Sequence, residues 1–344
     1  MKTLKVHGSK GISRIFIGER LQNLQKYTDS RQVVIITDRN VRNHYSKDLP
    51  SCYIIEIGTG ETMKNLDTVQ RIYLDLLRLG ADRSFFIVGI GGGVVSDITG
   101  FVASTYLRGL RFGFVSSTLL SQVDAGVGGK NGVNLMGYKN LVGTFNQPEF
   151  VICDTDLLKT LPEKEVRCGL AEVVKHACIG DACLFSYLEA HYKKALALDR
   201  DVMEKIIHDS VVIKSSIVNR DERESGERMK LNFGHTLGHA IEKTTGIPHG
   251  EAVGFGMLVA SRLSFKRGWL SKHEVTRIEA LLKKLNLPTR LKVDGNLVIE
   301  AMTKDKKRRS ESLNFVFLHG IGEAFVEQIP IKELGAGINE IIRL

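Results

Sequence analysis

The stretch SFFIVGIGGGVVSDITGFVAST, Ser84 to Thr105, reads as a strand, a glycine turn and a helix in that order. SFFIVGI is rich in β-branched and aromatic residues, which is typical of a buried strand. The contiguous glycines Gly91, Gly92 and Gly93 then leave backbone N–H groups bare at the start of a helix, where phosphate oxygens bind well. The turn lacks the G-x-G-x-x-G spacing of the usual dinucleotide fingerprint. It therefore indicates either a phosphate site or a structural tight turn, and Asp97 in the new helix is either a ligand contact or a solvated carboxylate.

The same alternation extends outward from this stretch through the N-terminal half. QVVIITD and RFGFVSST resemble further buried strands, MKTLKVHGSKGISRIFIG alternates as a strand does, and LDTVQRIYLDLLRLG has helical spacing with a glycine stop. Alternating strands and helices predict a parallel sheet with helices on its faces. We therefore expect an α/β domain over residues 1–150.

The second half changes character and becomes mostly helical. Apolar positions three and four apart recur in TLPEKEVRCGLAEVVKHAC, DVMEKIIHDSVVIKSSIV and HEVTRIEALLKKL. SLNFVFLHGIGEAFVEQI near the end predicts a small hairpin. We expect a mostly α-helical domain over residues 151–344.

Composition limits the class of protein. A chain of 344 residues is too long for one ordinary core, and 43% hydrophobic with 25% charged residues is typical of a globular protein. No apolar run has membrane-spanning length, and the N-terminus lacks a signal-peptide pattern. Five cysteines without a C-x-x-C pair predict a reducing cytoplasm. The net charge of +9 permits nucleic acid as a partner, but the basic residues are spread along the chain, and an anionic small substrate explains the excess equally well.

A second polar region is STLLSQVDAGVGGKNGVNLMGYKN, residues 117–140. It combines Asp124, Lys130, Asn134, Lys139 and Asn140 with five glycines. This mixture suits a loop folded closely around a polar ligand, and it equally suits a flexible surface loop with solvated lysines.

A third region, LNFGHTLGHAIEKTTGIPHGEAV, concentrates three of the ten histidines. On a helix, His235 and His239 would lie four apart on one face, and His249 would begin a second element after a proline. Two such histidines can share a metal, and Glu172, in the otherwise apolar GLAEVVKHA, could complete a three-ligand set. Each residue alone is explained by a satisfied core histidine or a surface glutamate. The cluster as a whole favours a metal site.

Together these motifs resemble the 3-dehydroquinate synthase family from about Gly60 to Gly320. The resemblance rests on the order and spacing of GETMK, GGGVVSDITGFVASTYLRG, STLLSQVDAGVGGKNGVN, KNLVGTFNQP, TLPEKEVRCGLAEVVKHA, LNFGHTLGHAIE, HGEAVGFGM and DKK. The family usually has a proline and two threonines where this chain has Ser116, Ser117 and Thr118.

The resemblance implies a Rossmann-like NAD-binding domain, a C-terminal metal-binding domain and an active site in the cleft between them. It implies a lyase that converts 3-deoxy-D-arabino-heptulosonate 7-phosphate into 3-dehydroquinate and phosphate, the second step of the shikimate pathway towards chorismate and the aromatic amino acids. A hydroxyl is oxidised transiently by NAD, phosphate is eliminated, the hydride is returned, and an aldol step closes the ring. The cofactors are NAD and one divalent metal, zinc or cobalt. The expected assembly is a cytoplasmic homodimer with an anionic sugar phosphate as substrate and neither nucleic acid nor membrane as a partner.

Residue roles follow from the matched motifs. The implied metal ligands are Glu172, His235 and His249. The implied substrate residues are Asp124, Lys130, Lys139, Asn140, Lys175, Lys214, Arg228, Asn232 and His239. Those implied to hold NAD are Asp38, Glu61, Lys64, Gly91, Gly92, Gly93, Asp97, Ser117, Thr118, Lys130, Lys139 and Thr160. Arg108 resembles an arginine contributed across a dimer interface. In TKDKKRRS, most charges are expected to be solvated, and DKK singles out Lys306 or Lys307 for an anionic end of the substrate.

Three other functions fit parts of the sequence. A cyclase acting on a neutral sugar phosphate shares most of these motifs, but Arg228 and the second DKK lysine favour a carboxylated substrate, which needs a cationic partner. A metal-dependent polyol dehydrogenase would release NADH. A nucleic-acid-binding protein would show salt-dependent binding, but the chain has no recognisable reading element.

Overall fold

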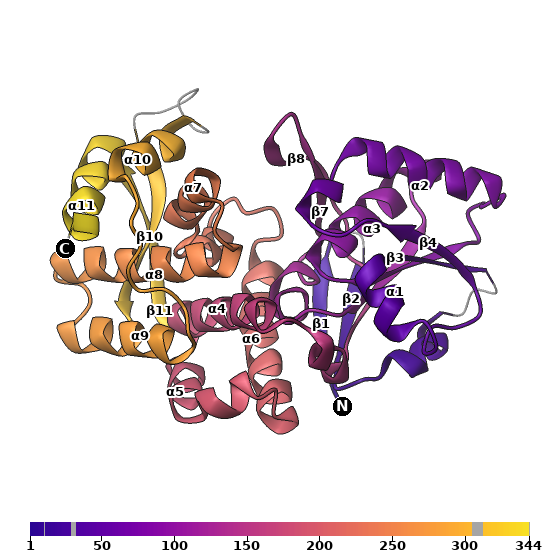
Figure 1. Ribbon diagram of the computed structural model, residues 1–344, viewed down its shortest axis with the longest axis horizontal. Helices are drawn as coiled ribbons and strands as arrows, with labels where there is room; N and C mark the ends of the chain where they lie inside the picture. The colour runs from indigo at the N-terminus through magenta and orange to yellow at the C-terminus, as the bar shows by residue number, and fades with distance from the viewer. Residues whose placement is uncertain (10, 29–31, 305–311, 344) are drawn as a thin grey trace. The chain divides into compact units, whose positions relative to one another are not determined.

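The computed structural model describes residues 1–9, 11–28, 32–304 and 312–343 (Figure 1). Contacts within the chain divide it into two units. Unit 1 comprises Met1–Pro162 with Lys214–Glu222, and unit 2 comprises Glu163–Ile213 with Arg223–Leu344.

Unit 1 is built on a seven-stranded sheet in the order β1-β2-β9-β6-β5-β3-β4, in which only the β1–β2 pair is antiparallel. Its strands and helices are β1 (Lys2–Gly8), β2 (Gly11–Ile17), β3 (Val33–Asp38), α1 (Arg39–Tyr45), β4 (Tyr53–Ile57), α2 (Leu66–Arg78), β5 (Phe86–Gly91), α3 (Gly93–Thr105), β6 (Arg111–Ser116), β7 (Lys130–Leu135), β8 (Tyr138–Phe145) and β9 (Phe150–Cys153). The expected parallel sheet, and the strand–turn–helix from Ser84, are confirmed.

The glycines of this strand–turn–helix let α3 lie close to the sheet. A Cβ on Gly89 would fall 2.8 Å from Thr99 Oγ1 of α3, and one on Gly91 would fall 2.5 Å from Val95 Cγ2. The strand itself is buried, with Phe86, Val88 and Ile90 in the core of unit 1. Side chains at these glycines would push α3 off the sheet.

The end of β5 also lies at the point where the chain reverses its direction of winding. β5 pairs with β3 on one side and β6 on the other, while β4 lies beyond β3. In open α/β sheets, ligands bind outside the carboxyl ends of the strands at such a point. Here those ends carry Asp38 on β3 and the Gly91–Gly93 turn on β5.

The prediction of one irregular loop over residues 117–140 is wrong in two places, since Ser121–Ala125 form a short π-helix and a hairpin follows. Residues 130–145 form an antiparallel hairpin of β7 and β8, with Leu135 opposite Tyr138. The two linking residues, Met136 and Gly137, have φ of 49° and 80°, which suits the twist of a two-residue hairpin. Methionine is an unusual residue in such a turn, so the sequence lacks the Asn-Gly signal that would have revealed it.

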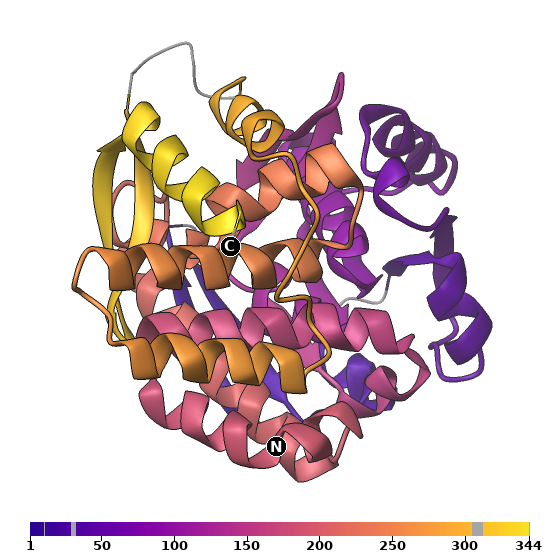
Figure 2. The same ribbon diagram turned by 60° about the vertical axis from the view of Figure 1, so that its left-hand side comes forward.

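Unit 2 is mostly helical, as predicted. Its elements are α4 (Glu163–Gly180), α5 (Ala182–Leu196), α6 (Arg200–Arg220, whose end from Lys214 belongs to unit 1), α7 (His235–Thr245), α8 (His249–Lys266), α9 (Lys272–Lys284), α10 (Gly295–Lys304), β10 (Ser312–Gly320), β11 (Glu323–Pro330) and α11 (Ile331–Arg343). The buried helix α8 packs against α4, α7, α9 and β10 (Figure 1 and Figure 2). The expected hairpin near the end is confirmed as β10 and β11. Among the described residues, no helix is both long and apolar enough to cross a membrane.

Glu274 forms hydrogen bonds at the N-terminus of α9 and to the turn between β10 and β11. Its Oε2 accepts hydrogen bonds from the Ser271 N–H (3.1 Å) and hydroxyl (2.7 Å), and its Oε1 accepts the Ile321 N–H at 3.0 Å. The Ser271 hydroxyl in turn accepts the Glu274 N–H, which completes a capping box. Burial alone would raise the pKa of Glu274, but these hydrogen bonds outweigh it and hold the pKa below its ordinary value of 4.5.

We expect Glu274→Ala to lower the free energy of unfolding of unit 2 by about 1–2 kcal/mol at pH 7, because an N-terminal cap and a bond to the β10–β11 turn are lost. The folded-state pKa is depressed, so this contribution is fully present above pH 4.5 and is lost as the pH falls through the folded value. Thermal unfolding at pH 7 and at pH 3.5 measures both effects. The exposed His273→Ala on the same helix is the control, and an equal loss at both pH values would contradict the assignment.

Candidate metal centre and ligand-binding residues

Helices α7 and α8 approach each other so closely that only glycine fits at Gly238 and Gly256. A Cβ on Gly256 would fall 2.1 Å from the Gly234 carbonyl oxygen, and one on Gly238 would fall 3.0 Å from Val253 Cα. His235 is the first residue of α7, and His249 is the first residue of α8. The close packing brings the two imidazole rings to within 5.4 Å, measured between centroids.

Helix α4 supplies a carboxylate to the same place. A Cβ on Gly250 would fall 2.4 Å from Cys168 Cα, so the first turn of α8 lies directly on α4. One turn after Cys168, the fully buried Glu172 places Oε1 at 3.5 Å from Nε2 of His235 and at 3.5 Å from Nε2 of His249. Its Oε2 forms an ion pair with the buried Lys175.

The donor set fits a divalent transition metal. Ligands about 2.0–2.1 Å from a tetrahedral ion are separated from one another by ~3.3–3.4 Å, close to the two 3.5 Å distances observed. One carboxylate and two imidazoles suit zinc or cobalt and leave a fourth position for water or substrate. The ring of His239 lies 5.3 Å from that of His235 and 5.8 Å from that of His249, outside the three-residue ligand group.

Burial and charge act in opposite directions on the two ligand histidines. Burial lowers the pKa of His235 to about 3, although Glu172 opposes the shift, so this ring is neutral and ready to bind a metal. Burial also disfavours a charged His249, but hydrogen bonds to Glu172 and Glu242 outweigh it and raise the pKa to about 9. In the absence of an ion, a proton on His249 thus balances part of the buried negative charge.

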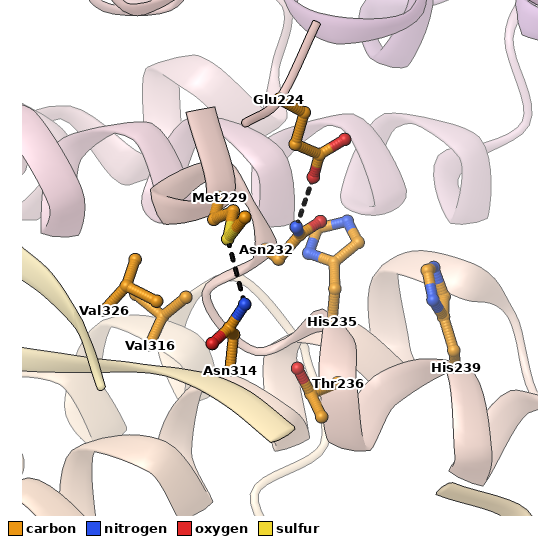
Figure 3. A pocket seen from close by; sticks show the side chains of 9 residues that line it. All are labelled: Glu224, Met229, Asn232, His235, Thr236, His239, Asn314, Val316 and Val326. Carbon is orange, nitrogen blue, oxygen red and sulfur yellow. Dashed lines mark hydrogen bonds between the residues drawn. The ribbon is translucent and has the colours of Figure 1, made fainter. Parts of the chain in front are cut away.

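A pocket of about 270 Å³ adjoins this group (Figure 3). It is lined by Glu224, Met229, Asn232, His235, Thr236, His239, Asn314, Val316 and Val326. His235 and His239 project from α7 toward the same side, with His239 one turn further on. The pocket therefore places an exposed imidazole beside a ligand of the candidate metal centre.

Glu224 is a pocket residue that the sequence analysis did not identify. Its Oε1 accepts a 2.6 Å hydrogen bond from Asn232 Nδ2 (Figure 3), and its backbone has a left-handed φ of 59°. Such a conformation costs free energy in a residue other than glycine and is concentrated at functional sites. Several acids in the run RDERESGERMK looked alike, so charge pattern could not single this one out.

Arg228 lies in the same run and is only 2% exposed. Charge density alone favoured a solvated arginine at this position. The short helical turn Glu227–Asn232 instead turns Arg228 inward, next to the residues that lead into α7. A buried guanidinium in a site suits recognition of a carboxylate or phosphate.

In unit 1, a polar network lies beside the glycine turn. The buried Lys64 forms an ion pair with Asp97 and donates to Asn140 Oδ1 at 2.5 Å. Burial raises the pKa of Asp97 above its ordinary value of 3.8, although Lys64 opposes the rise. The Gly91 carbonyl accepts the Ser117 N–H at 2.9 Å, which joins the two loops implied to hold a cofactor.

Other expected residues of unit 1 are distributed around this network. Lys214 forms an ion pair with Asp124 and donates to its carbonyl at 2.6 Å. Three more have partners of their own: Glu61 accepts from Asn134, Thr118 bonds Ser121, and Thr160 bonds Tyr45.

The remaining expected residues of unit 1 are a helix cap and three exposed cations. The side chain of Asp38 caps α1 by accepting the Val41 N–H at 3.0 Å. Lys130, Lys139 and Arg108 are exposed. Lys306 and Lys307 lie outside the described residues.

Comparison with known proteins accounts for both units. Residues 54–168 match the family model described as 3-dehydroquinate synthase N-terminal, and residues 169–308 match the one described as 3-dehydroquinate synthase C-terminal. The 3-dehydroquinate synthase of Dehalococcoides mccartyi (strain CBDB1) is 40% identical over 348 residues, which cover 96% of this chain and 97% of that protein.

Two solved structures share the fold at 27% identity. One is 2-deoxy-scyllo-inosose synthase complexed with carbaglucose-6-phosphate, NAD+ and Co2+, with a TM-score of 0.88 over 98% of this chain and 100% of that chain. The other is 2-epi-5-epi-valiolone synthase from Streptomyces hygroscopicus subsp. jinggangensis 5008 with NAD+ and Zn2+ bound, with a TM-score of 0.87 over 96% of each chain.

The geometry of α4, α7 and α8 predicts one zinc or cobalt ion per chain. His249→Ala should lower zinc affinity by at least about 100-fold, because one of three protein ligands is lost. His239→Ala should keep wild-type affinity, since its ring lies outside the ligand group. Competition with a chromophoric chelator measures both. Equal zinc content in wild type and His249→Ala would disprove the ligand set.

Proposed function

Because the chain belongs to the 3-dehydroquinate synthase family, we propose that it converts 3-deoxy-D-arabino-heptulosonate 7-phosphate into 3-dehydroquinate and phosphate. This is the second step of the shikimate pathway. The observation that carries the proposal is the cluster of Glu172, His235 and His249 beside a pocket that also contains His239. Such a site suits the activation of a hydroxyl group on a polar substrate.

The enzyme uses NAD and one divalent metal. Glu172, His235 and His249 would hold the metal, which would polarise the substrate hydroxyl that is oxidised. The nicotinamide would take up a hydride and return it, so that NAD is unchanged overall. We assign the NAD site to the domain of residues 1–150 and the metal site to that of residues 151–344.

The NAD site would use the switch point of the sheet in unit 1. Backbone N–H groups after Gly91 form the positive N-terminal end of α3, and Gly92 brings no side chain to cover them. The residues proposed around the cofactor are Asp38, Glu61, Lys64, Gly91, Gly92, Gly93, Asp97, Ser117, Thr118, Lys130, Lys139 and Thr160. The ion pair between Lys64 and Asp97 supports this grouping, because it holds two of these side chains rigidly at the turn.

The substrate is a polyanion, and the residues proposed for it are largely cationic or amide-bearing. In unit 2 they are Lys175, Arg228, Asn232 and His239, with Lys306 or Lys307. In unit 1 they are Asp124, Lys130, Lys139, Asn140 and Lys214. Arg228 is proposed for the carboxylate because a buried guanidinium offers a two-pronged match to that group.

Two pocket residues can move protons during elimination and ring closure. The carboxylate of Glu224 is oriented by Asn232, and the imidazole of His239 is exposed to the same pocket. We assign proton uptake from the substrate to this pair. Asn232 donates to the Glu224 carboxylate and also lines the pocket. It would therefore both orient the base and contact the substrate.

A cyclase that acts on a neutral sugar phosphate is the second candidate, since one of the two similar structures above is complexed with carbaglucose-6-phosphate, which has no carboxylate. The buried Arg228 argues against it, because its guanidinium offers a two-pronged match to a carboxylate, which a neutral substrate lacks. The higher identity to 3-dehydroquinate synthases points the same way.

We further propose a cytoplasmic homodimer. All five cysteines, each within the described residues, are free thiols, as expected in a reducing compartment. Unit 1 exposes the large apolar side chains of Leu107, Met136, Tyr138 and Leu141, which a second copy could cover. Arg108 follows Leu107 in a left-handed backbone conformation (φ of 68°), which would suit the proposed contact with the partner's substrate.

With zinc or cobalt present, the enzyme should release phosphate from the carboxylated heptulosonate phosphate in an NAD-dependent manner, with no net change in nicotinamide absorbance. A chelator should abolish the release, and added zinc or cobalt should restore it. A coupled phosphate assay recorded together with absorbance at the NADH maximum tests this. Stoichiometric accumulation of NADH would instead indicate a polyol dehydrogenase.

Arg228→Lys should weaken kcat/KM for the carboxylated substrate by roughly 1–3 kcal/mol, because a charge-assisted two-pronged hydrogen bond is lost. Metal and NAD binding should be unchanged. Arg223→Lys, at an exposed position in the same charged run, is the matched control. A preference of the wild type for a substrate without the carboxylate would instead support the neutral cyclase.

A further inference from the structure

The two ligand histidines are each held at the nitrogen that faces away from Glu172. His235 Nδ1 lies 3.2 Å from the Phe233 carbonyl oxygen, which belongs to the turn just before α7. His249 Nδ1 lies 3.2 Å from Oε2 of Glu242. Both acceptors favour a proton on Nδ1, so that each ring, once neutral, presents the Nε2 lone pair to the metal.

Glu242 is placed for this contact by the periodicity of α7. It lies seven residues after His235 and three after His239, so the three side chains share one face of the helix. α7 ends three residues later, and the chain turns through Gly246 (φ of 70°) into α8. The last turn of α7 thus reaches the first residue of α8.

The orientation of His249 depends more on its hydrogen-bond partner Glu242 than that of His235 depends on the Phe233 carbonyl. Both histidines begin their helices without a side-chain cap, so the difference between them lies in burial. The imidazole of His249 is 29% exposed, against 11% for His235, so packing restrains it less. Glu242 is itself largely buried, with 19% of its side chain exposed, so solvent screens the contact only in part.

We propose that Glu242 is a positioning residue of the metal site, which fixes the tautomer and orientation of His249 and makes its Nε2 a stronger donor. The inference rests on the proposed metal-binding function and deepens it. A carboxylate behind a metal-bound histidine raises the basicity of the ring, and loss of such a partner typically weakens metal binding 10–100-fold. Glu242 is not part of the three-residue ligand group and would act through His249.

The test is zinc affinity of the metal-free full-length protein, measured by competition with a chromophoric chelator. Glu242→Leu should weaken zinc binding about 10–100-fold. Glu242→Gln, which keeps an oxygen acceptor but loses the charge, should fall between Glu242→Leu and wild type. Glu279→Gln, which removes a carboxylate on α9 that pairs with Arg262 of α8 and Lys283 of α9, should bind as wild type does.

A second measurement separates positioning from a merely structural role. If Glu242 acts through His249, Glu242→Leu should have no further effect on zinc affinity in a His249→Ala background. A general loss of structure would weaken binding in both backgrounds. The visible spectrum of the cobalt-loaded protein should also change in Glu242→Leu at full occupancy, because the ligand geometry differs.

The outcomes distinguish this inference from the proposed function. Zinc binding within twofold of wild type in Glu242→Leu, with an unchanged cobalt spectrum, overturns the role of Glu242 and leaves the metal site intact. Equal losses in the wild-type and His249→Ala backgrounds also overturn it. Failure of the wild-type protein itself to bind zinc or cobalt would overturn the metal site. Glu242→Gln keeps the shape of the side chain, so it serves if Glu242→Leu does not fold.

Discussion

The carboxylate of Glu172, buried without exposure to solvent, is the constraint on which unit 2 depends. A buried charge costs several kcal/mol unless nearby groups replace its water. Lys175 and the two ligand histidines do so here, from one turn along α4 and from the starts of α7 and α8. The close glycine contacts between α7 and α8 bring His235 and His249 together beside Glu172. Packing and electrostatics therefore specify the same arrangement.

In unit 1, the backbone rather than charged side chains forms the main part of the candidate site. The glycines of β5 let α3 lie on the sheet, and the glycines that follow them leave N–H groups open at the positive end of α3. The ion pair of Lys64 and Asp97 then fixes the polar wall beside that turn. In one unit side-chain charges define the site, and in the other the path of the chain defines it.

Much of the fold was predictable because strong local periodicity coincides with burial. The strand and turn at Gly91 and the helices around Glu172 are of this kind. The hairpin turn at Met136 was missed because its residues lack the usual turn chemistry. The charge pattern could not predict that Glu224 lines the pocket or that Arg228 is buried. Only the path of the chain between α6 and α7 distinguishes these two residues from their charged neighbours. The proximity of the three candidate ligands was expected from the sequence. The contact between His249 and Glu242 could be found only in the folded structure.

Glu172 lies on α4, far in sequence from the two ligand histidines at the starts of α7 and α8, so an unfolded chain offers no comparable site. An ion that binds only the folded state stabilises it according to its free concentration, by about 2.7 kcal/mol at 100 times Kd. Proteases act on the fraction of molecules that has opened. The lifetime of this protein in a cell would therefore follow the supply of metal. Starvation for zinc or cobalt would lower the number of enzyme molecules as well as the activity of each one.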